Sequence, residues 1–112
     1  MKIAVPVEDE RLCMHFGHCG KFVIVTVDDA TKTITGKEEA VPPPHEPGVL
    51  PKWLHEKGVN VIIAGGMGMR AQQFFQQFGI QVVVGAPPDH PQEVILSWLK
   101  GELVTGGNVC DH

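Results

Sequence analysis

The sequence predicts an α/β domain in which a five-stranded mixed sheet lies between helices, as three α/β/α layers. Two observations lead to this prediction. The first half of the chain is a series of short β-rich runs, and the second half alternates helical with β-rich segments. The 112 residues are 43% hydrophobic, close to the average for globular domains and sufficient for one core. No internal repeat or interdomain linker divides the chain.

The first half predicts three strands, over residues 2–7, 21–27 and 33–41. Residues 21–27 are nearly all β-branched or aromatic, the composition that strands favour. Residues 28–32 form a turn, and the polar strand that follows is typical of a sheet edge with one solvated face. The three strands most simply form an antiparallel meander.

The second half begins after a triple-proline loop, which cannot enter a sheet ladder. Helices are expected over 50–57, 69–78 and 91–100, and buried strands over 59–64 and 80–84. A glycine follows each helix as a stop signal, and the apolar face of the second helix has the spacing i, i+3, i+4, i+7: Ala71, Phe74, Phe75 and Phe78. Two strands that each follow a helix imply parallel pairing through right-handed crossovers.

Composition excludes several classes of protein. A formal net charge of -4 argues against a binder of nucleic acid, which usually presents a basic face. No apolar run is long enough to span a membrane, and the first residues predict a strand and not a signal peptide. We therefore expect a cytoplasmic protein, in which the three cysteines serve as thiols or metal ligands and not as disulfide partners. Residues 1–103 form the domain, and residues 104–112 form a C-terminal tail.

Four candidate metal ligands lie within seven positions after the first strand: Cys13, His15, His18 and Cys19. Thiolate and imidazole together suit zinc, copper, iron and iron–sulfur centres. A single cysteine or histidine here would be an ordinary buried filler or loop residue, but four together favour a metal site.

Two further segments add candidate ligands. The tail ends in Cys110-Asp111-His112, so Cys110 and His112 repeat the spacing of Cys13 and His15. The alternative for these last residues is an unstructured terminus. His45 lies in a Pro-rich loop and is either a further ligand or a loop-positioning residue. His55, on a charged helix, and His90, at a helix start, are left outside the site.

A glycine-rich turn, residues 65–70, joins a buried strand to a helix. Its backbone N–H groups can receive an anion, and Arg70 adds a positive charge. The turn is neither a Walker loop nor a dinucleotide fingerprint, and tight packing is the common alternative. Its place after a strand is where open α/β sheets bind ligands. The expected contacts to an anion or cluster are therefore Gly65, Gly66, Met67, Gly68 and Arg70.

No catalytic signature accompanies these groups. The chain lacks a nucleophile elbow, and its one serine lies inside the last predicted helix. The acidic residues Glu8, Asp9 and Glu10 fall in a loop and do not form the inward carboxylate set of a two-metal nuclease. We therefore expect a binding protein and not an enzyme. An enzyme of phosphoryl or nucleotide chemistry that uses the glycine-rich turn is the least favoured reading.

The order and spacing of several motifs resemble the dinitrogenase iron–molybdenum cofactor biosynthesis family over about residues 1–103. The motifs are MKIAVPV at 1–7, HFGH at 15–18, FVIV at 22–25, PGVLP at 47–51, GGMGMRA at 65–71, Gly79-Ile80 and LKGEL at 99–103. The resemblance implies a ribonuclease H-like fold and a small non-enzymatic carrier of metal clusters. It also implies that His15 is the histidine of the family's His-Phe-Gly motif. The cysteines and the tail are not implied by the resemblance.

The leading hypothesis is a carrier of an iron–sulfur or iron–molybdenum type metallocluster or its precursor, with cluster-assembly proteins as partners. The alternative is a mononuclear zinc or iron site in a structural or regulatory interaction module. Neither nucleic acid nor membrane is an expected partner, and the oligomeric state stays open.

Overall fold

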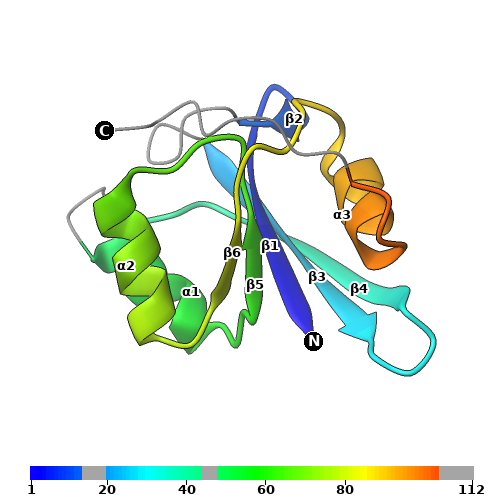
Figure 1. Cartoon of the computed structure of the whole chain (residues 1–112), viewed down its shortest axis with the longest axis horizontal. Helices are drawn as coiled ribbons and strands as arrows, with labels where there is room; N and C mark the ends of the chain where they lie inside the picture. Colours follow the sequence, from blue (N-terminus) through cyan, green and yellow to red (C-terminus); the bar gives the residue numbers. More distant parts are fainter. Residues whose placement is uncertain (14–19, 44–47, 104–112) are drawn as a thin grey trace.

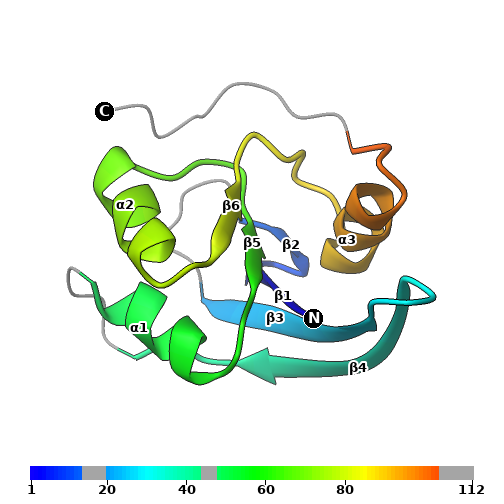
Figure 2. The same ribbon diagram turned by 60° about the horizontal axis from the view of Figure 1, so that its bottom comes forward.

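A computed structural model describes residues 1–13, 20–43 and 48–103. Within these ranges the chain forms a mixed sheet with helices on both faces (Figures 1 and 2). The elements in chain order are β1 (Lys2–Glu8), β2 (Arg11–Leu12), β3 (Lys21–Asp28), β4 (Thr33–Ala40), α1 (Val49–Glu56), β5 (Val61–Ile63), α2 (Met69–Gln77), β6 (Gln81–Val83) and α3 (Pro91–Leu99). The predicted three-layer α/β/α architecture is confirmed.

The main path through the sheet has the order β4-β3-β1-β5-β6. Strands β1, β3 and β4 pair antiparallel, which confirms the predicted meander, and β5 and β6 add to β1 in parallel. The two-residue strand β2 pairs with β1 outside this path and was not predicted. Strand β2 brings the loop after β1 back along β1 before the chain moves on to β3.

The sheet separates two hydrophobic cores because β1 and β3 alternate their side chains between the two faces. On one face Ile3, Val5 and Val7 of β1 pack with α3. On the other face Ala4 packs with α1, α2 and the fully buried Phe75. Figure 2 shows this division, with α1 and α2 on one side of the sheet and α3 on the other. Because β1 is buried on both faces, it is the central strand of the domain.

All three helices end in the same hydrogen-bonded turn, with a glycine of positive φ after the C-cap. In α2 the N–H of Gly79 (φ 74°) bonds to the carbonyl of Gln76, and the N–H of Ile80 bonds to the carbonyl of Phe75. This pair of bonds is the Schellman motif, which requires a left-handed residue and so favours glycine. The predicted stops are therefore confirmed. The strands begin one or two residues later than predicted because the residues after each glycine close the helix.

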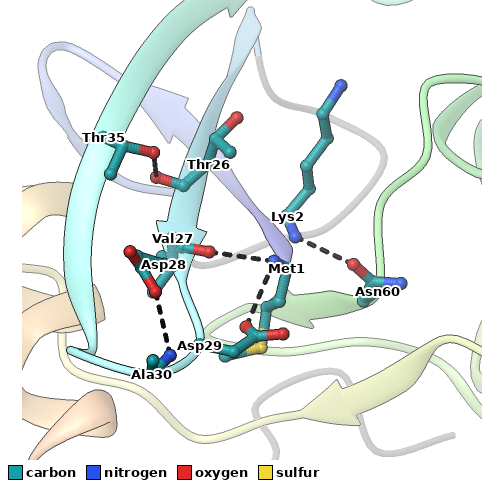
Figure 3. A network of polar contacts seen from close by, with 9 residues as sticks. All are labelled: Met1, Lys2, Thr26, Val27, Asp28, Asp29, Ala30, Thr35 and Asn60. Atoms are coloured by element: carbon teal, nitrogen blue, oxygen red, sulfur yellow. Dashed lines mark hydrogen bonds and ion pairs between the residues drawn. The ribbon is translucent and has the colours of Figure 1, made fainter.

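Polar contacts fasten the edge of the sheet where β1 begins (Figure 3). The α-amino group of Met1 donates to the carbonyl of Val27 at 2.9 Å and pairs with the Asp29 carboxylate at 3.2 Å. The backbone N–H of Lys2 donates to Oδ1 of Asn60 at 2.8 Å. These contacts connect the start of β1 to the turn after β3 and to the residue before β5. They lie at the opposite end of the strands from the candidate site.

Candidate functional site

Strands β1, β5 and β6 run parallel, so their carboxyl ends meet at one edge of the sheet. Three connections leave this edge: the β1–β2 turn, the glycine-rich turn from β5 to α2, and the turn from β6 to α3 (Figure 1). Ligands of open α/β sheets bind at this edge. Among the described residues, two of the predicted site segments, Cys13 and residues 65–70, lie here.

The pairing registers bring Cys13 to the end of β5. Leu12 pairs with Val7 of β1, and the N–H of Cys13 donates to the carbonyl of Pro6 at 2.8 Å. Ala4 pairs with Ile62 of β5 on the same side of β1. Continuing that parallel register by two residues brings the end of β5 to the level of Pro6. Cys13 therefore lies where β5 gives way to the glycine-rich turn.

Pro6 explains why β2 ends here. Proline has no N–H to donate to a ladder, so central strands rarely contain it. In this sheet Pro6 lies beyond the last pairs of both β5 and β2, so neither neighbouring strand depends on a hydrogen bond from its nitrogen. Beyond Leu12 the chain leaves the ladder and enters the predicted ligand loop.

Cys13 is buried, with 8% of its surface exposed, and it is disulfide-bonded. Its partner lies outside the described residues. This state differs from the thiol expected from the sequence, because residue spacing alone does not determine which cysteines pair. A disulfide sulfur is not a thiolate, so Cys13 can ligate a metal only after reduction.

Six other predicted ligands fall outside the described residues, which leaves their roles as predictions. They are His15, His18, Cys19, His45, Cys110 and His112. In residues 1–13, 20–43 and 48–103 alone, no group of three or more His, Cys, Asp or Glu side chains could hold a metal ion. A metal site in this protein would therefore need ligands from the remaining segments.

The first part of the glycine-rich turn is buried structure. The carbonyl of Gly65 accepts a hydrogen bond from the N–H of Gly85, which ties this turn to the turn after β6. Met67 is fully buried in the core of the α1/α2 face, and its carbonyl accepts a bond from Nε2 of Gln72 at 2.9 Å. Met67 is thus a core residue.

The second part of the turn, from Gly68 to Arg70, is more exposed than the first. Gly68 is the N-cap of α2, with φ −66° and ψ 156°, a conformation that any residue adopts. A Cβ added to Gly68 would meet no atom within 4 Å, so neither backbone geometry nor packing requires glycine here. No side chain caps the helix at Gly68, and the first turn contains no acidic residue. The exposed Arg70 follows at the second helical position.

This arrangement suits an anion. The first N–H groups of a helix lack intrahelical partners, and the helix dipole makes its N-terminus positive. A glycine that the fold does not require allows a ligand to approach the backbone closely. The α2 N-terminus and Arg70 therefore present positive charge at this edge of the sheet.

The two histidines left outside the predicted site have contacts of their own. His55 is exposed on α1, and its ring stacks on Phe78 with centroids 4.9 Å apart. His90 is the N-cap of α3, as predicted, and its Nδ1 lies 3.2 Å from the carbonyl oxygen of Glu10. The N–H of Leu12 also donates to the carbonyl of Asp89 at 2.9 Å. These last two contacts fix the β1–β2 hairpin against the start of α3.

A separate cavity of about 590 Å³ lies on the α3 face, between α3 and strands β3 and β4. Its lining includes Lys21 and Glu39, whose charged groups are 2.9 Å apart. The hydrogen bond and charge of Lys21 lower the pKa of Glu39, and the same contact with Glu39 raises the pKa of Lys21. Cys13 and the glycine-rich turn do not line this cavity, so its charges belong to a different part of the surface.

Sequence reasoning missed two side chains that hold the site. Gln72 fastens the glycine-rich turn, and the carboxylate of Glu8 accepts a hydrogen bond from the N–H of Gly20 at 3.1 Å. Glu8 was expected in a loop, but it is the last residue of β1. A polar residue directly after a buried apolar run was the available signal for such an anchor.

Residues 1–101 match the family described as dinitrogenase iron-molybdenum cofactor. The chain belongs to this family. A relative, the uncharacterized protein MJ0580 of Methanocaldococcus jannaschii, is 37% identical over 108 residues, which cover 92% of this chain and 89% of that protein. The resemblance found in the sequence motifs is therefore confirmed.

Solved structures support the same fold. The crystal structure of PH0822 matches with a TM-score of 0.85 at 29% identity and covers 95% of this chain and 96% of that chain. The apo form of the orange protein from Desulfovibrio gigas matches with a TM-score of 0.73, covering 96% of this chain and 93% of that one. At 24% identity the orange protein supports the fold alone. Within the described ranges, no helix is long and apolar enough to cross a membrane.

Proposed function

We propose that this protein is a cytoplasmic, non-enzymatic carrier of an iron–sulfur or iron–molybdenum type cluster, or of its precursor. Family membership connects the chain to iron–molybdenum cofactor chemistry. The observation that carries the proposal is the location of Cys13 and the glycine-rich turn at the same carboxyl edge of the sheet. Cluster-assembly proteins would deliver the cargo to this edge and receive it there.

The two parts of the site have different roles. Cys13 and Cys19 supply thiolates and His15 supplies an imidazole, the ligand types that bind iron, copper and zinc. His18, His45, Cys110 and His112 are further candidates. Sulfide-containing clusters are commonly anionic, so the N–H groups after Gly68 and the guanidinium of Arg70 would balance their charge.

The redox state of Cys13 decides whether this site can bind a cluster. The disulfide at Cys13 must be reduced before its sulfur becomes a ligand. A reducing cytosol keeps thiols in that form. We therefore expect cluster uptake by reduced protein under anaerobic conditions and little uptake by oxidised protein.

The test begins with untagged protein purified anaerobically with reductant. Its visible spectrum is recorded beside elemental analysis for Fe, Mo, Cu, Zn and sulfide. Broad charge-transfer absorbance, with iron, molybdenum or copper together with sulfide, supports the carrier. A colourless protein with one zinc per chain contradicts it and favours the mononuclear site. Metal-free protein is then supplied with iron and sulfide, and failure to take up a cluster also contradicts the proposal.

Variants locate the site. We expect the double variant Cys13→Ser/Cys19→Ser to lose the charge-transfer absorbance, and His15→Asn to weaken it. His55→Asn is the matched control, because His55 is an exposed histidine on α1. Unchanged absorbance in the cysteine double variant would show that these thiols are not required.

A further inference from the structure

The cavity on the α3 face has the size of a binding site for a small organic ligand. Its volume of about 590 Å³ lies within the usual range for such sites, roughly 300–1,000 Å³. Strands β3 and β4 form one wall, and the first turns of α3 form the other. The apolar part of the lining consists of Val7, Val23, Pro91 and Leu96. The first three of these are buried, so the core holds this apolar surface in place.

Strand register directs two charged side chains of β4 to the cavity. Val23 of β3 pairs with Glu39, and Val25 pairs with Lys37. Both valines belong to the core under α3. Residues directly opposite each other in a sheet share a face, so Glu39 and Lys37 lie on the α3 face as well. Glu39 pairs with Lys21 at 2.9 Å, which largely balances their charges and leaves Lys37 as the positive charge of this wall.

The remaining charges of the cavity lie at its two ends. Lys37 and Gln92 also line an adjoining cavity of about 300 Å³ that continues along β3 and β4. Glu93 instead also lines a small cavity beside the turn from β6 to α3. Glu10 is held near that turn, since its carbonyl oxygen lies 3.2 Å from Nδ1 of His90. The cavity therefore has an acidic end, at Glu10 and Glu93, and a basic end, at Lys37.

The distance between the two ends sets the length of a matching ligand. Lys21 lies near the acidic end, because its pKa is raised by the hydrogen bond to Glu39 and, to a smaller extent, by the charge of Glu10. Val25, the partner of Lys37, lies further along the same strand. Its distance from Lys21 along the strand is about 14 Å at about 3.4 Å per residue. The reach of the charged side chains shortens this distance to that of an extended chain of about three residues. A single amino acid is too short, because its ammonium and carboxylate groups share one carbon atom.

We propose that this cavity binds a short zwitterionic peptide, about three residues long, with an apolar side chain. The amino terminus of the peptide meets the carboxylates of Glu10 and Glu93, and its carboxylate meets the ammonium group of Lys37. No salt bridge in the described parts of the chain includes any of these three groups. The amide of Gln92 can bond to a peptide group, and the apolar side chain covers Val23. The inference goes beyond the proposed function, because Cys13 and the glycine-rich turn do not line this cavity.

The experiment titrates glycyl-leucyl-glycine into the metal-free full chain and follows the protein by ¹H–¹⁵N spectra. We expect the amide signals of Val23, Lys37 and the side chain of Gln92 to shift, and the signal of Gly68 to stay in place. The same peptide is then tested with its amino terminus acetylated or with its carboxylate amidated. Each blocked form should bind about 10-fold more weakly, since that is the worth of one hydrogen bond between charged groups.

Variants assign each end of the peptide to its end of the cavity. Lys37→Gln should weaken binding of the free peptide and leave binding of the amidated peptide unchanged. Glu10→Gln should weaken binding of the free peptide and leave binding of the acetylated peptide unchanged. Lys52→Gln and Glu56→Gln remove exposed charges from α1 and are the matched controls, which should bind normally. Lys37, Glu10 and both control residues are exposed, so the melting temperatures of all four variants should stay close to that of the unchanged protein.

Several outcomes would overturn the inference. Spectra that do not change at millimolar peptide would mean that the cavity does not take this ligand. Equal affinity for free and blocked peptides would show that the charged ends are not recognised, and binding of free leucine as tight as that of the tripeptide would contradict the length. If Lys37→Gln weakened the amidated and free peptides equally, its effect would be structural. Because the titration uses metal-free protein, failure of the cluster proposal leaves this result unaffected.

Discussion

Replacement of Gly68 by serine should separate cargo binding from stability. Gly68 has an extended backbone conformation, and a Cβ there meets no atom within 4 Å. Serine is a favoured N-cap because its hydroxyl accepts a hydrogen bond from an N–H in the first helical turn. Those N–H groups are the donors proposed for the anionic cargo. The new side chain would therefore occupy the donors and fill the space above them.

The expected magnitudes follow from this geometry. Exchange of serine and glycine at an N-cap changes stability by about 0.3 kcal/mol, in favour of serine. For a domain of this size the melting temperature should rise by about 1–2 °C. Loss of one hydrogen bond to a charged group is worth about 1.5 kcal/mol, so cargo affinity should fall roughly 10-fold.

The assay pairs thermal unfolding, followed by circular dichroism, with titration of the reduced protein by iron and sulfide under anaerobic conditions. Gly79→Ala is the control, because a Cβ at Gly79 also meets no atom within 4 Å but its φ is +74°. That variant should lose about 1 kcal/mol from left-handed strain and bind cargo normally. Unchanged cargo affinity in Gly68→Ser would refute the idea that the α2 N-terminus contacts the cargo.

Three other predictions concern the fold. Phe75→Ala empties a fully buried position in the core and should cost about 3–5 kcal/mol in urea unfolding; a loss below 1 kcal/mol would contradict the core assignment. Asn60→Ala removes the acceptor of the hydrogen bond from the Lys2 N–H and should lower the free energy of unfolding in urea by about 1 kcal/mol. Asn60→Asp keeps the acceptor oxygen and should not show this loss. Glu39 has a lowered pKa and Lys21 a raised one. Their ion pair therefore contributes to stability at pH values above the ordinary pKa range of glutamate and below that of lysine. The small stability difference between Lys21→Gln and the unchanged protein should therefore vanish as pH falls through the lowered pKa of Glu39, and also in high salt; persistence in acid would exclude the ion pair as its cause.

Much of the fold was predictable because its signals are local. The β-rich runs that became β1 and β3, and the helical spacing of α2, depend on neighbouring residues alone. The glycines after the helices also mark a local requirement, namely a left-handed residue in the closing turn. The prediction of which α2 side chains face the core was less accurate. Only Phe75 of its predicted apolar face is fully buried, while Phe74 and Phe78 are partly covered, because α1 and the sheet close over one side of the helix.

The arrangement of the site was less predictable because it depends on contacts between distant segments. The motif around Cys13 and the glycine-rich turn were both visible in the sequence, about fifty positions apart. Their proximity follows from the parallel pairing of β1 with β5 and from β2, which has two residues and no periodic signal. The bond from Gly20 to Glu8 and the disulfide at Cys13 likewise depend on where the chain returns to itself.

By itself the sequence determined the class of fold, the ends of the helices, the family and the types of candidate ligand. Each of these depends on residue type and short spacing, because backbone preferences and ligand chemistry act over a few residues. Only the tertiary structure decided that Met67 is a core residue and that Gly68 is free of packing constraint. Only the tertiary structure also showed that the carboxylate of Glu8 accepts a hydrogen bond from the N–H of Gly20. These properties depend on burial and strand register, which arise only when distant parts of the chain pack together.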